Sequence, residues 1–187
     1  MDVVDGRQRF RALYEEHWQA LFGFACRRAE TVEDAADVTS EVFLVAWRRI
    51  AEVPLGQQAR LWLFGVARLT MSNHLRGERR RERLGDALLS AVRENHGDAD
   101  RWFDRDESAE RIRTALGKLS EADREVICLV AWEDLTPGQA AHVLGINATA
   151  ARTRLSRARR RLKALLDQQS PVELSRLAIG SPWRGQS

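Results

Sequence analysis

Hydrophobic residues recur at every third or fourth position along three stretches of the N-terminal half of the chain. This spacing places them on one face of an α-helix, so each stretch is predicted to be helical. The first helix begins near Phe10, the second follows a capping box at Thr31 and Asp34, and the third begins near Leu61. In the first two helices, the residues predicted to face the core are Phe10, Leu13, Tyr14, Trp18, Leu21, Phe22 and Ala25, and then Val32, Ala35, Val42, Phe43, Ala46, Trp47 and Ile50.

The C-terminal half predicts two helices followed by a helix-turn-helix. Hydrophobic stripes cover residues 112–119 and 126–132, and Ser120 is placed to cap the second of these helices. Thr136 is the predicted cap of a short helix with Pro137 in its first turn, Gly145 permits a left-handed turn, and Asn147 caps the next helix. A helix, a tight glycine turn and a second helix form the layout of many DNA-binding domains.

The order of these segments predicts an all-α protein with two helical units. No stretch alternates in the manner of a β-strand, and the acidic segment around residues 93–107 lacks periodicity, so it is predicted to be a linker. The expected divisions are a helical bundle at 1–92, the linker at 93–107, a helix-turn-helix domain at 108–166 and a C-terminal tail at 167–187. Cys26 and Cys128 stand far apart in apolar patterns, which predicts buried free thiols. No apolar run approaches the length of a membrane span, so neither membrane insertion nor a location outside the cytoplasm is expected.

The last predicted helix carries the strongest functional signal. The net charge is only +3, but arginines concentrate in "INATAARTRLSRARRRL" at residues 146–162. Ala151, Leu155, Ala158 and Leu162 fall on one face, which leaves arginines and short hydroxyl residues on the opposite face. Such a surface fits the DNA major groove, because arginine pairs with guanine through two hydrogen bonds and small side chains permit close approach. The predicted DNA contacts are Thr149, Arg152, Thr153, Ser156, Arg157 and Arg160, and a solvated cationic helix is the alternative.

Acidic residues form a second surface on the second predicted helix. Asp34, Asp37 and Glu41 recur at spacings of three and four residues, which places them on one face. A solvated face is the ordinary explanation of this spacing, and a cation site lacks the loop that chelation usually needs. No metal, cofactor or catalytic residue is predicted from the chain.

Three blocks of sequence, in order, resemble the extracytoplasmic-function sigma factors, the promoter-specificity subunits of bacterial RNA polymerase. They are "DAADVTSEVFLVAWRRI", "LWLFGVARLTMSNHLRGERRR" and "LSEADREVICLVAWEDLTPGQAAHVLGINATAARTRLSRARRRL". The resemblance covers the chain from about Phe10 to Leu166. It implies an N-terminal bundle of the sigma region 2 type and a C-terminal helix-turn-helix domain of the sigma region 4 type. The tail beyond Leu166 has no counterpart in the resemblance.

The resemblance assigns a partner to each surface. It implies that Asp34, Asp37 and Glu41 contact the clamp helices of the largest subunit of core RNA polymerase, and that the second subunit contributes its flap. Ser40 and Ala36 depart from the family at this surface, where glutamine and an acidic residue are common. The arginine helix would read the minus-thirty-five element of promoter DNA. An anti-sigma factor is a further candidate partner.

The basic end of the third helix is similar to the family segment that melts DNA and reads the upstream edge of the minus-ten element. The resemblance implies contacts from Asn73, Arg76, Arg79 and Arg80. Leu69 departs from the family, because asparagine is common at the matching place in an "ARN" triplet.

Two other classes of function compete with this interpretation. A stand-alone helix-turn-helix regulator would bind duplex DNA without polymerase, but it leaves the acidic helix and the second basic helix without a role. An enzyme is disfavoured because His17, His74, His96 and His142 are dispersed and no nucleophile or phosphate-binding motif is recognised. A module that binds only protein leaves the arginine helix unexplained.

Overall fold

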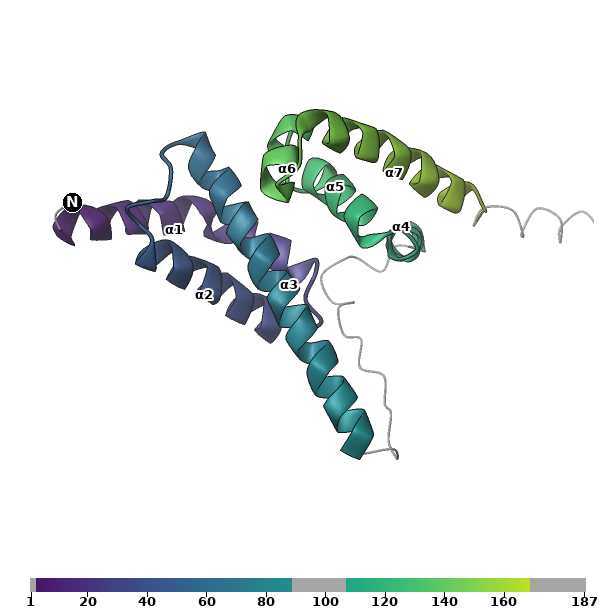
Figure 1. Ribbon diagram of the computed structural model, residues 1–187, viewed down its shortest axis with the longest axis horizontal. Helices are drawn as coiled ribbons and strands as arrows, with labels where there is room; N and C mark the ends of the chain where they lie inside the picture. The colour runs from purple at the N-terminus through teal and green to yellow at the C-terminus, as the bar shows by residue number, and fades with distance from the viewer. Residues whose placement is uncertain (1–2, 89–106, 169–187) are drawn as a thin grey trace, which may run out of the picture.

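The computed structural model describes residues 3–88 and 107–168, and side chains within residues 5–77 and 111–168. These parts are all-helical, as predicted from the sequence, and the chain traces two groups of helices that lie side by side (Figure 1). We call α1–α3 the N-terminal bundle and α4–α7 the C-terminal unit. The helices are α1 (Val3–Cys26), α2 (Val32–Arg48), α3 (Gln57–Leu88), α4 (Glu107–Gly117), α5 (Glu121–Ala131), α6 (Pro137–Leu144) and α7 (Ala148–Gln168).

The N-terminal bundle is built around fully buried side chains from all three of its helices. Phe24 of α1, Val42 of α2 and Leu63 and Phe64 of α3 are almost completely removed from solvent. Helix α3 continues well past the packed part of the bundle, so its C-terminal half projects away from it (Figure 1). It begins at Gln57 rather than near Leu61, because the loop ends at Gly56, whose φ of 59° permits the turn into the helix.

The helix-turn-helix prediction is confirmed in its local details. Thr136 and Gln139 form a reciprocal capping box at the start of α6, with Pro137 in the first turn. Gly145 adopts φ 65° and ψ 32°, the left-handed conformation that turns the chain out of α6. Asn147 then caps α7, because its Oδ1 accepts a hydrogen bond of 2.7 Å from the backbone N–H of Ala150. These short-range bonds fix the direction in which α7 leaves the turn.

In α1 and α2, four of the side chains predicted to face the core are instead partly exposed. Tyr14, Trp18, Val32 and Trp47 each keep more than a third of their surface accessible. The aromatic ones pack edgewise or in stacks along the rim of the bundle: Trp18 stacks on Phe22, and Trp47 meets Phe10 at 5.2 Å between ring centroids. The apolar stripes of α1 and α2 are each wider than the surface that the neighbouring helices can cover. The side chains at the edges of each stripe therefore face water.

Cys26 and Cys128 are free thiols, as predicted, and Cys128 is buried while Cys26 is only half-buried. Burial raises the pKa of both thiols, so they remain protonated. Within the described ranges 3–88 and 107–168, no helix has the length and hydropathy to cross a membrane.

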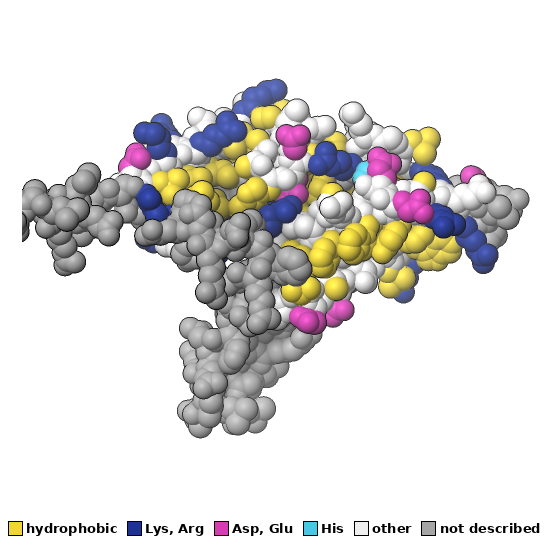
Figure 2. Space-filling view, turned by 180° about the vertical axis from the view of Figure 1, so that it is seen from behind, with side chains coloured by type: hydrophobic (Ala, Val, Ile, Leu, Met, Phe, Trp, Pro, Cys, Tyr) yellow, Lys and Arg dark blue, Asp and Glu magenta, His cyan; other side chains and the backbone are white. Residues whose placement is uncertain are grey.

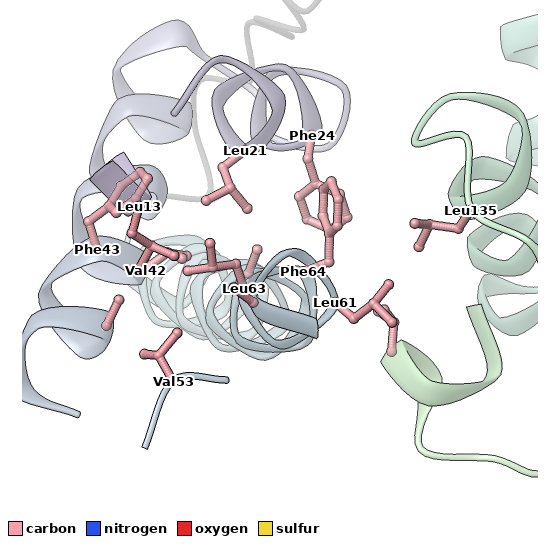
Figure 3. Close-up of a cluster of buried hydrophobic side chains, with 14 of the residues drawn as sticks. Leu13, Leu21, Phe24, Val42, Phe43, Val53, Leu61, Leu63, Phe64 and Leu135 are labelled. Atoms are coloured by element: carbon pink, nitrogen blue, oxygen red, sulfur yellow. The ribbon is translucent and has the colours of Figure 1, made fainter. Parts of the chain in front are cut away.

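The two halves of the molecule share one hydrophobic cluster, whereas the sequence predicted a separate core for each. Helix α3 packs against α6, and Leu61 and Phe64 of α3 face Leu135 of the C-terminal unit across the boundary (Figure 3). Residues from both halves therefore exclude water jointly. A second cluster, centred on Val126 and Leu155, lies wholly within the C-terminal unit.

Candidate DNA and polymerase interfaces

Helix α7 separates its apolar and polar side chains as the sequence predicted. Ala151, Leu155 and Ala158 are buried against the C-terminal unit. The opposite face is exposed to solvent along the length of the helix and carries all six predicted DNA-contact residues. These are Thr149, Arg152, Thr153, Ser156, Arg157 and Arg160. The helix therefore presents a continuous, positively charged surface with short hydroxyl side chains at its N-terminal end.

A hollow beside α7 gathers more of the positive charge. It is lined by Arg154, Arg157, Arg160 and Arg161 of α7 together with Ser120 and Asp123 at the start of α5. Arg161 is held there by Asp123, with 3.2 Å between Nη1 and Oδ2. The N-terminus of α5 contributes the positive end of a helix dipole to the same hollow. The three other arginines, beside a helix N-terminus, are suited to bind an anionic group such as a phosphate.

The acidic residues of α2 divide into two kinds. Asp37 and Glu41 are exposed and lie one helical turn apart. Asp34 is instead held within the bundle: its Oδ1 lies 3.2 Å from Nε2 of His74 on α3, and its other oxygen accepts a hydrogen bond from the hydroxyl of Thr31. The geometry therefore leaves Asp37 and Glu41 available to a partner, while Asp34 joins α2 to α3.

Two hydrophobic side chains extend the α2 surface and were missed as surface residues in the sequence. Leu44 is 46% exposed and Trp47 is 41% exposed, and they follow Glu41 at intervals of three residues. The exposed strip of α2 thus runs from acidic to apolar, with Ser40 beside Glu41. The width of the hydrophobic stripe in the sequence could have indicated this exposure, because the neighbouring helices cannot cover all of its outer side chains.

The basic end of α3 is only partly described. Asn73 and Arg76 are both exposed, and Nη2 of Arg76 donates a hydrogen bond of 2.6 Å to Oδ1 of Asn73. Arg79 and Arg80 lie on the same helix, but their side chains are outside the described residues. Leu69, which departs from the family pattern, is also exposed on α3.

One charged cluster between the two halves was not foreseen from the sequence. Glu133 follows α5 and is buried, with its Oε2 2.6 Å from Nη2 of Arg27 and its Oε1 3.3 Å from Nη1 of Arg28. Arg60 of α3 donates a hydrogen bond of 2.6 Å to the backbone carbonyl of Glu133. Neither a helix stripe nor a motif marks Glu133, because the two arginines that pair with its carboxylate lie more than a hundred residues away in the chain.

The face of the molecule seen from behind shows how these side chains are distributed (Figure 2). Hydrophobic side chains gather in a band across the N-terminal bundle, with acidic and basic side chains along its edges. No group of His, Cys, Asp or Glu in the described part of the chain is arranged to hold a metal ion. What the geometry offers is surface for binding: a cationic helix, an acidic and apolar strip, and a basic helix end.

Comparison with known proteins identifies the family of this chain. Residues 13–81 match the family model described as sigma-70 region 2, and residues 109–162 match the model described as sigma-70, region 4. The chain is 34% identical over 177 residues to the RNA polymerase sigma factor CnrH of Cupriavidus metallidurans, which covers 90% of this chain and 92% of that protein. It is 32% identical to the ECF RNA polymerase sigma factor SigL of Mycobacterium tuberculosis, covering 84% of this chain and 89% of SigL.

Solved structures agree with this relationship. The structure of CnrH in complex with the cytosolic domain of CnrY has a TM-score of 0.63 and 28% identity, and it covers 88% of this chain and 96% of that one. The sigma factor RpoE of Bartonella quintana, solved with the anti-sigma factor NepR, shares the fold with a TM-score of 0.65 at 24% identity over 84% of this chain and 96% of that one. Both sigma regions occur on this one chain, with region 2 before region 4. The protein therefore belongs to the extracytoplasmic-function (ECF) RNA polymerase sigma factors.

Proposed function

We propose that this sigma factor binds core RNA polymerase through α2, reads duplex promoter DNA through α7 and captures unpaired promoter bases through the end of α3. The observation that carries the proposal is the presence of three distinct exposed surfaces on the two sigma regions of one chain. A stand-alone regulator needs only one of them, the face of α7. No catalytic step is part of the proposal.

Duplex reading is assigned to α7 because its exposed face combines arginines with short hydroxyl side chains. Thr149, Arg152, Thr153 and Ser156 lie nearest the turn, where recognition helices contact base edges. Arg157 and Arg160 line the hollow at the start of α5, so they are placed to contact both the groove and the adjoining phosphates. In the proposal this face recognises the minus-thirty-five element.

Polymerase binding is assigned to the exposed strip of α2. Asp37 and Glu41 supply negative charge for the clamp helices of the largest subunit, and Leu44 and Trp47 supply apolar area beside it. A charged rim with an apolar centre is the usual composition of a protein interface. Asp34 acts from within the bundle by fixing the start of α2 against α3. The flap of the second subunit is the proposed partner of the C-terminal unit.

Capture of the opened minus-ten element is assigned to Asn73 and Arg76, with Arg79 and Arg80 further along the same helix. A cationic surface follows the backbone of single-stranded DNA, while amide and guanidinium groups recognise exposed base edges. The hydrogen bond between Arg76 and Asn73 must open or rearrange when either side chain contacts a base. When one of two linked sites on the chain has bound promoter DNA, the effective concentration of DNA at the other site rises.

An anti-sigma factor is a proposed regulatory partner, since CnrH, a relative of this chain, is solved with the cytosolic domain of CnrY. Because core RNA polymerase acts in the cytoplasm of bacteria, the proposed place of action is the cytoplasm. The chain's own tail, residues 169–187, lies outside the described residues.

The direct test is run-off transcription with purified bacterial core polymerase on a pool of promoter fragments, with and without the protein. We expect selective transcripts that depend on the protein, and their start sites reveal the promoter sequence. A Thr153→Ala and Ser156→Ala double variant should lose selectivity, whereas Glu15→Gln, on the exposed side of α1, serves as a matched surface control. Absence of transcripts with a competent core enzyme, combined with tight duplex binding by the protein alone, would favour the stand-alone regulator.

A further inference from the structure

A cavity of about 290 Å³ lies between the N-terminal bundle and the C-terminal unit. Its lining comes from the end of α1, the middle of α3, the end of α4 and one face of α5, together with Trp132. Its volume is close to the lower end of the range for ligand pockets, which is about 300–1,000 Å³. The cavity is therefore sized for a small molecule.

Arginines outnumber carboxylates around this cavity. Five arginines and two glutamates line it, and the carboxylate of Glu133 pairs with two of these arginines. The lining charges are those of Arg27, Arg28, Arg68, Arg113 and Arg124, and of Glu121 and Glu125. With Glu133 counted as the third carboxylate, two positive charges remain unbalanced. This excess attracts anions to the cavity.

Three of these arginines have hydrogen-bonding capacity to spare. Arg27 donates to Glu133 through Nη2, and Arg28 donates to Glu133 and to the carbonyl of Phe24 through Nη1. Nη1 of Arg68 lies 3.8 Å from Oε2 of Glu125, which is too far for a hydrogen bond. Among the described residues, no acceptor meets the buried Nε of Arg27, Nη2 of Arg28 or Nε of Arg68. Unpaired buried donors cost free energy, and an anion toward which these guanidinium groups turn would supply the missing acceptors.

The charges around the cavity are also removed from water further than their partners compensate. Burial lowers the pKa of Arg28, although Glu133, Cys128 and Glu125 act in the opposite direction. Burial likewise raises the pKa of Glu125 in spite of Arg68 and Arg28. A further negative charge close to Arg28 would favour its charged form.

The remaining wall of the cavity is largely apolar. Leu75 of α3, Leu116 of α4 and the ring of Trp132 contribute to it. The guanidinium of Arg27 lies 5.8 Å from the centre of the Trp132 ring, so charged and apolar groups adjoin within the cavity. Ligand pockets commonly combine an apolar wall with a few polar groups that fix the orientation of the ligand. A matching ligand carries an anionic group next to an apolar part.

We propose that this cavity is a binding site for a small organic anion, in which a phosphate or carboxylate group is joined to an apolar or aromatic part. The anionic group binds Arg28 and Arg68, since guanidinium groups recognise both phosphate and carboxylate through paired hydrogen bonds. The apolar part packs against Leu116 and Trp132. None of these residues belongs to the three surfaces of the proposed function, so the site does not depend on that proposal. It gives the chain a means of responding directly to a small molecule.

The test is isothermal titration calorimetry of the full chain with phenyl phosphate and with benzoate at constant ionic strength. Both anions should bind, and phenyl phosphate should bind more tightly, because a phosphate monoester carries about two negative charges at neutral pH. Benzamide matches benzoate in shape without its charge, and inorganic phosphate lacks the apolar part. Each of these two should bind at least about tenfold more weakly than its counterpart, because each loses one of the two kinds of contact.

Nuclear magnetic resonance and variants locate the bound anion. The indole N–H signal of Trp132, assigned with Trp132→Phe, should shift when phenyl phosphate is added. Arg68→Gln should weaken binding of phenyl phosphate at least about tenfold. Arg11→Gln removes the same charge at an exposed position of α1 and should bind as the wild type does. If circular dichroism shows that Arg68→Gln has lost helix content, Arg113→Gln on α4 takes its place.

Three results would overturn the site. The first is that neither anion binds the wild type at millimolar concentration, and the second is that benzamide binds as tightly as benzoate. The third concerns the hollow beside α7, which also gathers arginines. If Arg157→Gln abolishes binding and Arg68→Gln does not, the anion lies in that hollow rather than in the cavity.

Discussion

Oδ1 of Asp34, at the start of α2, lies 3.2 Å from Nε2 of His74 on α3. A residue of the predicted polymerase surface therefore also connects two helices of the N-terminal bundle. Asp34→Ala should lower the free energy of unfolding by about 1–2 kcal/mol, because it removes this contact and the hydrogen bond from Thr31. Asp37→Ala, at an exposed position, should leave stability within about 0.5 kcal/mol and weaken core binding instead. Urea unfolding and a core-binding titration on both variants separate the two roles. Equal effects of the two variants in both assays would contradict this division.

Reversal of charge at Glu41 tests the polymerase surface directly. Glu41→Lys should weaken binding to core RNA polymerase, because a cation replaces an anion in the middle of the exposed strip of α2. The fold should be unaffected, since the side chain contacts solvent. Glu15→Lys on the exposed side of α1 is the control for a general change of charge. Core affinity is measured by fluorescence anisotropy, and equal losses in both variants would show that net charge rather than the α2 strip is responsible.

Arg157 tests the duplex-reading surface. Arg157→Ala should lower transcription from promoters with a minus-thirty-five element at a cost of about 1–3 kcal/mol in DNA recognition, and it should leave core binding intact. Arg11→Ala removes an exposed arginine far from α7 and serves as the control. The measurements are abortive initiation and core affinity on the same preparations. Loss of core binding by Arg157→Ala to the same extent as transcription would refute the division of labour between the two halves.

The buried imidazole of His17 predicts a dependence of stability on pH. Its side chain is 8% exposed, and burial holds its pKa below the ordinary value of 6.5; Glu16 opposes the shift and Arg60 adds to it. The unfolded chain therefore takes up this proton at a higher pH than the folded chain. The contribution of His17 to stability is complete above about pH 7 and is lost as the pH falls below 6.5, at no more than about 1.4 kcal/mol per pH unit.

Urea unfolding between pH 5 and pH 8 measures this slope, with pH values chosen at about half-unit steps to bracket the ordinary pKa. His17→Gln should flatten the His17 part of the profile, because glutamine does not titrate. His142→Gln, at an exposed position on α6, should retain the wild-type slope. A profile for His17→Gln that parallels the wild type would assign the pH dependence to other groups.

Local features of the fold could be read from the sequence because short-range bonding determines them. Thr136, Gly145 and Asn147 occupy the predicted positions around α6 and α7, since a cap or a left-handed turn depends on residues only a few positions away. The exposed face of α7 followed for the same reason, as its buried positions recur with the helical period.

Features that depend on distant partners could not be read in this way. Trp47 belongs to a hydrophobic stripe in the sequence, yet it lies at the edge of the surface that α1 covers. Nothing near Glu133 in the sequence indicates that Arg27 and Arg28 will surround it. Likewise, the role of Asp34 as a tie depends on His74, which lies on another helix. The periodic spacing of residues in the sequence indicates whether a helix face is apolar or charged. What covers that face depends on how the helices pack.

The hydrophobic cluster shared by the two halves also bears on the solubility of the protein. Leu61, Phe64 and Leu135 cover one another in this cluster, so their apolar surface is removed from water. Exposed patches of this kind promote self-association. The contact between the two halves therefore keeps the apolar surface of each half from associating with other molecules.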